Sequence, residues 1–219
     1  MWDGFELPGA VAHEMRGFGS TPLPATGEFS HAADLEERLG GEPAALVGSS
    51  FGGGVCLELA ARRPDLVERL VLLDAPLPDH DWSQEILDYA EREEELIEEG
   101  EHRAAAEWNA DFWLSAAAPP EVRARVIDMQ ERAFELQSAS DAEEIGVERI
   151  DLEAVRARTL IAVGALDLAD FHRIAERLHV EIGGSEPAVI EHAGHLPALE
   201  RPAATAELVR SFLLDNACE

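Results

Sequence analysis

One serine in this chain stands inside a glycine pattern at the point where an apolar run ends. The stretch ALVGSSFGGG contains Gly48-x-Ser50-x-Gly52, with a further glycine at Gly53. A nucleophile on a tight turn between a strand and a helix needs small neighbours, because a side chain at Gly48 or Gly52 would collide with the strained turn. The pattern therefore predicts that Ser50 is an exposed nucleophile.

The residue after this serine adds a second chemical group. A helix that begins here would direct its first N–H groups toward Ser50, so the Phe51 backbone N–H could bind a developing oxyanion. A glycine-rich turn from strand to helix can also bind phosphate. The Lys-Ser/Thr pair of a P-loop does not follow the glycines, however. The local pattern thus favours nucleophilic catalysis.

A serine hydroxyl needs a base, and the base needs a carboxylate that orients it. Asp167 follows the apolar run TLIAVG, and His195 follows the run PAVIEH. Asp74 follows the run LVLL and could supply the carboxylate instead, since an acid after either strand could reach the same imidazole. His192 is a weaker candidate for the base because it lies closer to its strand, and we expect it to pack or cap locally.

Short apolar runs alternate with helical patterns along most of the chain. The runs 43–48, 69–76, 159–164 and 187–192 are typical of buried parallel strands. Helical patterns occupy 53–63, 171–178 and 203–214. This alternation predicts an α/β fold, a mostly parallel sheet covered by helices on both faces.

The stretch 78–149 breaks this rhythm with charged helical segments. We expect residues 1–77 and 150–219 to form the core and residues 78–149 to form a helical insertion over one edge of the sheet. Its Trp108, Phe112 and Trp113 suggest an apolar substrate pocket, although helix packing is the commoner reason for such spacing.

The chain is strongly acidic, with 45 Asp and Glu against 17 basic residues, all arginine, for a formal net charge of -28. Such a surface repels nucleic acid and anionic lipid, so we expect neither as a partner. It suits a protein that works in concentrated salt, where self-repulsion is screened. A codon bias toward arginine explains it equally well. The run EREEELIEEGE (91–101) is expected to be a solvated helix face.

Length and composition suit a globular protein with one sizeable core. The apolar runs are too short to span a bilayer, and the N-terminus lacks the basic and apolar regions of a signal peptide, so we expect a cytoplasmic protein. Cys56 and Cys218 match no metal or redox spacing, so we expect no metal site and assign the two thiols no role.

Four segments resemble motifs of the α/β-hydrolase superfamily, in its esterase, lactonase and haloperoxidase-like branch. EMRGFGST is similar to the D-x-R-G-x-G-x-S segment, with Glu14 where aspartate is usual. VGSSFGG resembles the nucleophile elbow, VGALDLADF the acid loop and HAGHLPALERP the histidine loop. The resemblance runs almost end to end. It implies that Ser50, Asp167 and His195 form a catalytic triad and that residues 78–149 form a cap.

The resemblance also narrows the chemistry. A serine nucleophile disfavours haloalkane dehalogenases and epoxide hydrolases, which use aspartate. The segment GFG resembles the start of a dinucleotide fingerprint, but Pro22 and Pro24 interrupt the helix that this motif must open, so we expect no nicotinamide cofactor and no other cofactor.

One departure from the family concerns the N-terminus. Family members carry roughly thirty residues before the segment matching MWDGFELPG, with the first strands and an oxyanion loop. Without that loop's N–H, transition-state stabilisation would fall by about 2.7 to 4 kcal/mol. We expect an N-terminally truncated sheet, in which a strand near Val11 to Glu14 and the strand at 43–47 have lost the strand between them. An unpaired strand edge would favour association into a homo-oligomer.

Two functions follow. The first is a cofactor-free serine hydrolase that cleaves a small ester or lactone through an acyl-enzyme on Ser50. The second is a truncated, non-catalytic or cryptic protein of the same fold. A carbon–carbon bond hydrolase or a perhydrolase would use the same triad.

Overall fold

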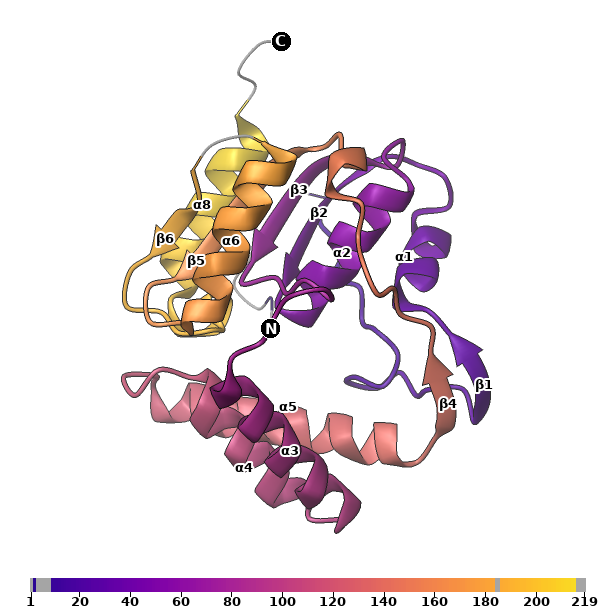
Figure 1. Ribbon diagram of the computed structural model, residues 1–219, viewed down its shortest axis with the longest axis vertical. Helices are drawn as coiled ribbons and strands as arrows, with labels where there is room; N and C mark the ends of the chain where they lie inside the picture. The colour runs from indigo at the N-terminus through magenta and orange to yellow at the C-terminus, as the bar shows by residue number, and fades with distance from the viewer. Residues whose placement is uncertain (1, 3–8, 184–185, 216–219) are drawn as a thin grey trace.

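The computed structural model describes residues 2, 9–183 and 186–215 of the chain (Figure 1). Its centre is a parallel sheet with the strand order β2-β3-β5-β6. These strands are β2 (Ala44–Ser49), β3 (Val67–Leu73), β5 (Arg158–Gly164) and β6 (Ala188–Ile190). All four coincide with apolar runs of the sequence, so the predicted parallel α/β sheet is confirmed.

Helices follow the strands as the alternation predicts. Their bounds are α1 (His31–Leu39), α2 (Phe51–Arg62), α6 (Ala169–Ile182), α7 (Pro197–Glu200) and α8 (Pro202–Leu214), with a short 3-10 turn, η1, at Leu152–Ala154. The expected helices at 53–63, 171–178 and 203–214 correspond to α2, α6 and α8, and the structure extends the first two toward their N-termini.

Both faces of the sheet are buried, which explains the uninterrupted apolar runs. Leu70 and Leu72 of β3 pack into a cluster with side chains of α1, α2 and α6. Val71 and Leu73 point to the opposite face, where Val209 of α8 covers them. Successive strand residues point to opposite faces of the sheet, so each residue from Leu70 to Leu73 is buried in the apolar cluster on one of the two faces.

The strand expected near Val11 to Glu14 is absent, and this expectation was wrong. Residues 11–14 are irregular, and β2, next to which the lost strand was expected, is one of the two edge strands of the sheet in the described part of the chain. A strand needs a hydrogen-bonded neighbour, and no described strand lies beside these residues. A second, two-stranded parallel sheet, which the sequence did not predict, pairs β1 (Thr26–Phe29) with β4 (Asp141–Glu144).

Three helices separate β3 from β4 in the chain. They are α3 (Gln84–Glu98), α4 (His102–Trp113) and α5 (Pro120–Ser138), and in Figure 1 they lie below the main sheet as a layer of their own. The acidic run 91–101 is mostly exposed, with Leu96 as its one buried residue, as a solvated helix face requires. The division into core and insertion at residues 78 and 149 stays a prediction.

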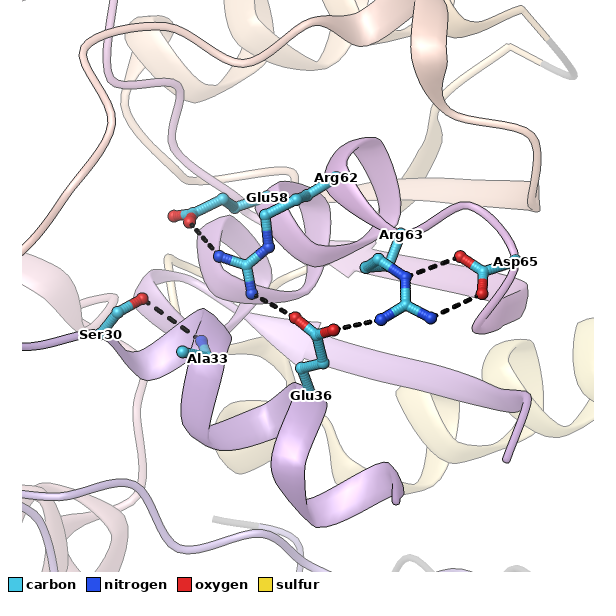
Figure 2. A network of polar contacts seen from close by, with 7 residues as sticks. All are labelled: Ser30, Ala33, Glu36, Glu58, Arg62, Arg63 and Asp65. Carbon is cyan, nitrogen blue, oxygen red and sulfur yellow. Dashed lines mark hydrogen bonds and ion pairs between the residues drawn. The ribbon is translucent and has the colours of Figure 1, made fainter. Parts of the chain in front are cut away.

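Arginines at the end of α2 bind carboxylates of α1 and of the following turn (Figure 2). Glu36 accepts a hydrogen bond of 2.9 Å from Arg62 and also pairs with Arg63. Arg63 in turn donates to both carboxylate oxygens of Asp65. These pairs are partly exposed, so each contributes only about 0 to 1 kcal/mol. Together they pair two neighbouring arginines with carboxylates of the acidic chain.

The structure also bears on the two cysteines and on the expectation of no membrane span. Cys56 is a buried free thiol whose pKa is raised to about 12 by burial, so it is inert, whereas Cys218 lies outside the described residues. Among the described residues, none of the helices combines the length and the apolar character needed to cross a membrane.

Candidate active site

Ser50 forms the turn between β2 and α2. Its backbone has φ 49° and ψ -126°, a conformation that costs a residue with a side chain about 1 to 3 kcal/mol. The turn is held on both sides, because the Ser50 N–H donates to the Leu73 carbonyl at 2.8 Å and the Gly53 N–H donates to the Ser50 carbonyl at 2.7 Å. Strain stored at a single serine, at the carboxyl edge of a parallel sheet, is the arrangement that the glycine pattern predicted.

The space around each glycine near Ser50 shows which positions have no room for a side chain. A side-chain carbon on Gly48 would overlap the carbonyl of Gly52, and one on Gly53 would lie 2.7 Å from the Cβ of Ala75. One on Gly52 would meet only the Met15 methyl group, at an ordinary 3.7 Å. The expectation that a side chain at Gly52 would collide with the turn was therefore wrong. Gly53 is the glycine that needs its small size, because it lies against Ala75, just after the end of β3.

This difference predicts opposite effects of two alanine substitutions. Gly53→Ala should destabilise the protein by about 1 to 3 kcal/mol, since the added methyl has no free space. Gly52→Ala should be neutral or stabilising by up to about 1 kcal/mol, because alanine is the better helix former. Thermal unfolding of the two variants measures the difference, and equal melting temperatures would contradict it.

Ser50, His195 and Asp167 form one hydrogen-bonded chain. His195 Nε2 lies 2.7 Å from Ser50 Oγ, and His195 Nδ1 lies 2.8 Å from Asp167 Oδ2. The residues come from the ends of β2, β5 and β6, which meet at the same edge of the sheet. This geometry allows the imidazole to accept the serine proton while the carboxylate orients the ring.

Asp167 is ionised in a buried position. Only 1% of its side chain is exposed, and burial alone would raise its pKa. The hydrogen bond and charge of His195, the neighbouring Asp74 carboxyl group and the Leu168 N–H outweigh burial, so the pKa of Asp167 lies below its usual value. The carboxylate is therefore available as an acceptor for the imidazole.

His195 is enclosed by two aromatic rings and tied to the helical layer. The ring centroids of Trp113 and Phe171 lie 4.3 Å and 4.2 Å from that of His195. The backbone N–H of His195 also donates a hydrogen bond to the Trp113 carbonyl at 3.1 Å. These contacts bury the imidazole and place the end of α4 directly over it.

The two alternatives weighed from the sequence lie in different places. Asp74 is buried at the end of β3, where its Oδ1 accepts a 2.8 Å hydrogen bond from the Gly164 N–H. His192 is exposed in a turn with φ 61°, so it does not pack in the core, and the expected alternative of a local cap stays a prediction. Asp74, Asp167 and His195 also have ligand-type atoms within 4.8 Å of one another. Both His195 nitrogens are already hydrogen-bonded, which fits a proton relay better than metal coordination.

Glu200 joins the histidine loop to the helical layer, a role that the sequence did not reveal. Its carboxylate is buried and accepts the Gly194 N–H at 3.0 Å and the Ser115 N–H at 3.2 Å. The sequence signal was the Glu near the end of HAGHLPALERP, but one of its two partners, Ser115, lies 85 positions away in the chain.

The three aromatic residues predicted to line a pocket lie in different surroundings. Of these aromatics, Trp113 contacts His195, and Phe112 stacks on Tyr89 and packs against Trp113. Trp108 is 39% exposed and donates its indole N–H to the Tyr89 carbonyl. A cavity of about 410 Å³ has Phe51 in its wall but none of Ser50, Asp167 and His195. It is lined by Arg16, Phe18, Leu23, Phe29, His31, Phe51, Gln137, Ala142 and Glu144.

Comparisons with known proteins agree on one family. The model of the alpha/beta hydrolase family matches residues 2–208. A thermophilic esterase from Thermogutta terrifontis superposes with a TM-score of 0.72 at 26% identity, covering 91% of this chain and 77% of its own. A pimeloyl-(acyl-carrier protein) methyl ester esterase of Neisseria meningitidis is 27% identical over 218 residues, 92% of this chain and 67% of its own length.

Another relative has a higher sequence identity over a shorter segment. A 2-hydroxymuconate semialdehyde hydrolase of Pseudomonas putida is 44% identical over 69 residues, which is 29% of this chain. That match spans 25% of the relative's own length.

Proposed function

Because the chain belongs to the alpha/beta hydrolase family, we propose that it is a serine hydrolase that cleaves a small carboxylic ester or lactone. The observation that carries this proposal is the hydrogen-bonded chain from Ser50 through His195 to Asp167. We propose that these three residues are a catalytic triad, with Ser50 as nucleophile, His195 as base and acid, and Asp167 as the residue that orients the imidazole.

In the first half of the reaction, Ser50 Oγ attacks the carbonyl carbon while His195 Nε2 takes the serine proton. The tetrahedral intermediate collapses as His195 returns this proton to the leaving alcohol oxygen, which leaves an ester on Ser50. In the second half, His195 deprotonates a water that attacks this ester, and the proton passes back to Ser50. For a lactone, the leaving oxygen stays attached to the acyl group.

The developing oxyanion needs a donor. The Phe51 N–H stands at the first position of α2, where first-turn N–H groups have no acceptor within the helix and the helix dipole favours negative charge. We propose that it donates to the oxyanion. Residues 78–149 would act as a cap that shapes the pocket, with Trp113 over the imidazole.

The substrate class is supported by two observations. Two relatives that align with nine-tenths or more of this chain are named as esterases. Phe51, the residue after the proposed nucleophile, also lines a cavity together with Phe18 and Phe29, and these rings suit an apolar part of the substrate.

A second candidate reaction is favoured by the 44% match to a semialdehyde hydrolase. The same triad would then act on a small semialdehyde in place of an ester. Assays of p-nitrophenyl esters, lactones and the semialdehyde at equal enzyme concentration distinguish the substrate classes.

Labelling with a fluorophosphonate tests the proposal directly. We expect a single adduct by intact mass on the wild-type protein, which is lost in Ser50→Ala. The reaction is run in low and in high salt, because salt screens the self-repulsion of a chain with net charge -28. No adduct in either salt, from protein shown to be folded, would favour the non-catalytic alternative.

A further inference from the structure

We propose that Asp74 is a positioning residue for Asp167, held as a neutral carboxylic acid that donates a hydrogen bond to the Asp167 carboxylate. The inference deepens the proposed function, because it assumes that Asp167 orients His195. Asp74 does not touch the reacting atoms in this proposal. It acts through the residue that holds the base.

The first observation is an unmatched oxygen. Asp74 Oδ1 accepts the Gly164 N–H, but its Oδ2 is buried, and no donor lies within hydrogen-bond distance of it in the described part of the chain. A buried carboxylate oxygen without a donor is costly. Protonation solves the problem, because Oδ2–H becomes a donor and needs only an acceptor nearby.

The second observation is that such an acceptor is present. Asp74 and Asp167 follow the neighbouring strands β3 and β5, and both carboxyl groups are buried. One oxygen of each lies within 4.8 Å of the other and of a His195 ring nitrogen. Two buried carboxyl groups at this separation do not both ionise, so one proton stays between them.

The proton belongs to Asp74 because the surroundings of the two groups differ. Burial, then the neighbouring Asp167 carboxylate, together with the charge of Glu200, raise the pKa of Asp74 well above its usual value, against the Gly164 N–H. Asp167 has His195 and the Leu168 N–H to stabilise its negative charge. The titratable groups that face Asp74 are thus Asp167 and His195, from the loops after β5 and β6, and Glu200 at the end of α7.

The third observation is backbone strain at the same residue. Asp74 has φ 48°, a left-handed conformation that aspartate and asparagine adopt more readily than other residues with side chains. Its N–H is fixed on the Ala162 carbonyl at 2.9 Å. The carboxyl group points from the end of β3 toward the end of β5, where its Oδ1 accepts the Gly164 N–H. The Asp74 hydrogen bond then fixes the Asp167 side chain with Oδ2 toward the imidazole.

Asp74→Asn is the conservative test. Its amide oxygen can accept the Gly164 N–H, its NH₂ can donate to Asp167, and it never ionises. In the wild type the folded protein keeps a proton that the unfolded chain releases above about pH 4, so the folded state binds more protons and loses stability as pH rises. We therefore expect the difference in melting temperature, Asp74→Asn minus wild type, to increase as the pH rises from about 5 to about 8.

Asp65→Asn is the matched control for this measurement. Asp65 is exposed, and the Arg63 hydrogen bond holds its pKa below the usual value, so it is ionised in both states across this range. Its difference from wild type should stay constant with pH. A constant or shrinking gain for Asp74→Asn would overturn the proposal. This readout needs no substrate, so it is independent of whether Ser50 is catalytic.

Kinetics then separate positioning from a purely structural role. We expect Asp74→Asn to keep kcat within about three-fold of wild type at neutral pH. Asp74→Ala, measured well below its own melting temperature, should lose about 10- to 100-fold in kcat with little change in KM, because Asp167 is no longer held in place. Wild-type kinetics for folded Asp74→Ala, or an Asn variant as impaired as the Ala variant, would each contradict the role. If Asp74→Ala does not fold, the pH dependence of Asp74→Asn alone decides.

Discussion

Replacing Ser50 with alanine is expected to lower kcat for ester hydrolysis by about 10⁴- to 10⁶-fold, to the level left by binding and the oxyanion donor alone. The Oγ atom that His195 contacts at 2.7 Å is the atom that forms the acyl bond, and alanine has no substitute for it. Initial rates with a p-nitrophenyl ester measure the effect. Removing the hydroxyl does not change the backbone strain of the turn, so the variant should remain folded.

Ser49 offers a matched control one residue earlier. It is buried at the end of β2, and its hydroxyl has no hydrogen-bond partner within the described residues. Ser49→Ala removes an unsatisfied polar group, so we expect unchanged kcat and equal or higher stability. If Ser49→Ala and Ser50→Ala lost activity alike, the effect would come from the strand end and not from a nucleophile.

The second large effect is expected for Asp167→Asn, which should lower kcat by about 10³- to 10⁴-fold. An amide nitrogen facing His195 Nδ1 donates where the carboxylate accepts, so the imidazole turns to the wrong tautomer. It also removes the negative charge that stabilises the imidazolium formed when Ser50 is deprotonated. The rate of fluorophosphonate labelling and the kcat for an ester should fall together.

Asp170→Asn neutralises a second buried carboxylate only three residues away. Asp170 accepts hydrogen bonds from the Ser83 N–H and from Arg173 and lies 3.0 Å from His80, away from the proposed triad. We expect it to lower the melting temperature and to leave kcat near wild type. High residual activity in Asp167→Asn would instead mean that Asp74 supplies the carboxylate, the alternative that the sequence left open.

Local patterns were sufficient for much of this fold. Each buried strand is an uninterrupted apolar run because both faces of the sheet are covered, and the turn at Ser50 follows from its glycines. The same local reasoning failed at Gly52, because contact with a side chain depends on what crosses the turn. It also failed at residues 11–14, because a strand depends on a neighbour that its own residues cannot specify.

The sequence by itself determined the fold class and the three residues proposed for catalysis, since these depend on hydrophobic periodicity and on residue types that follow strand ends. Only the tertiary structure decided which groups touch. It brought Ser50 to His195 across 145 positions, set Asp74 beside Asp167, and joined Glu200 to Ser115. Burial and pairing between distant segments control charge and proton position, and no local pattern in the sequence encodes them.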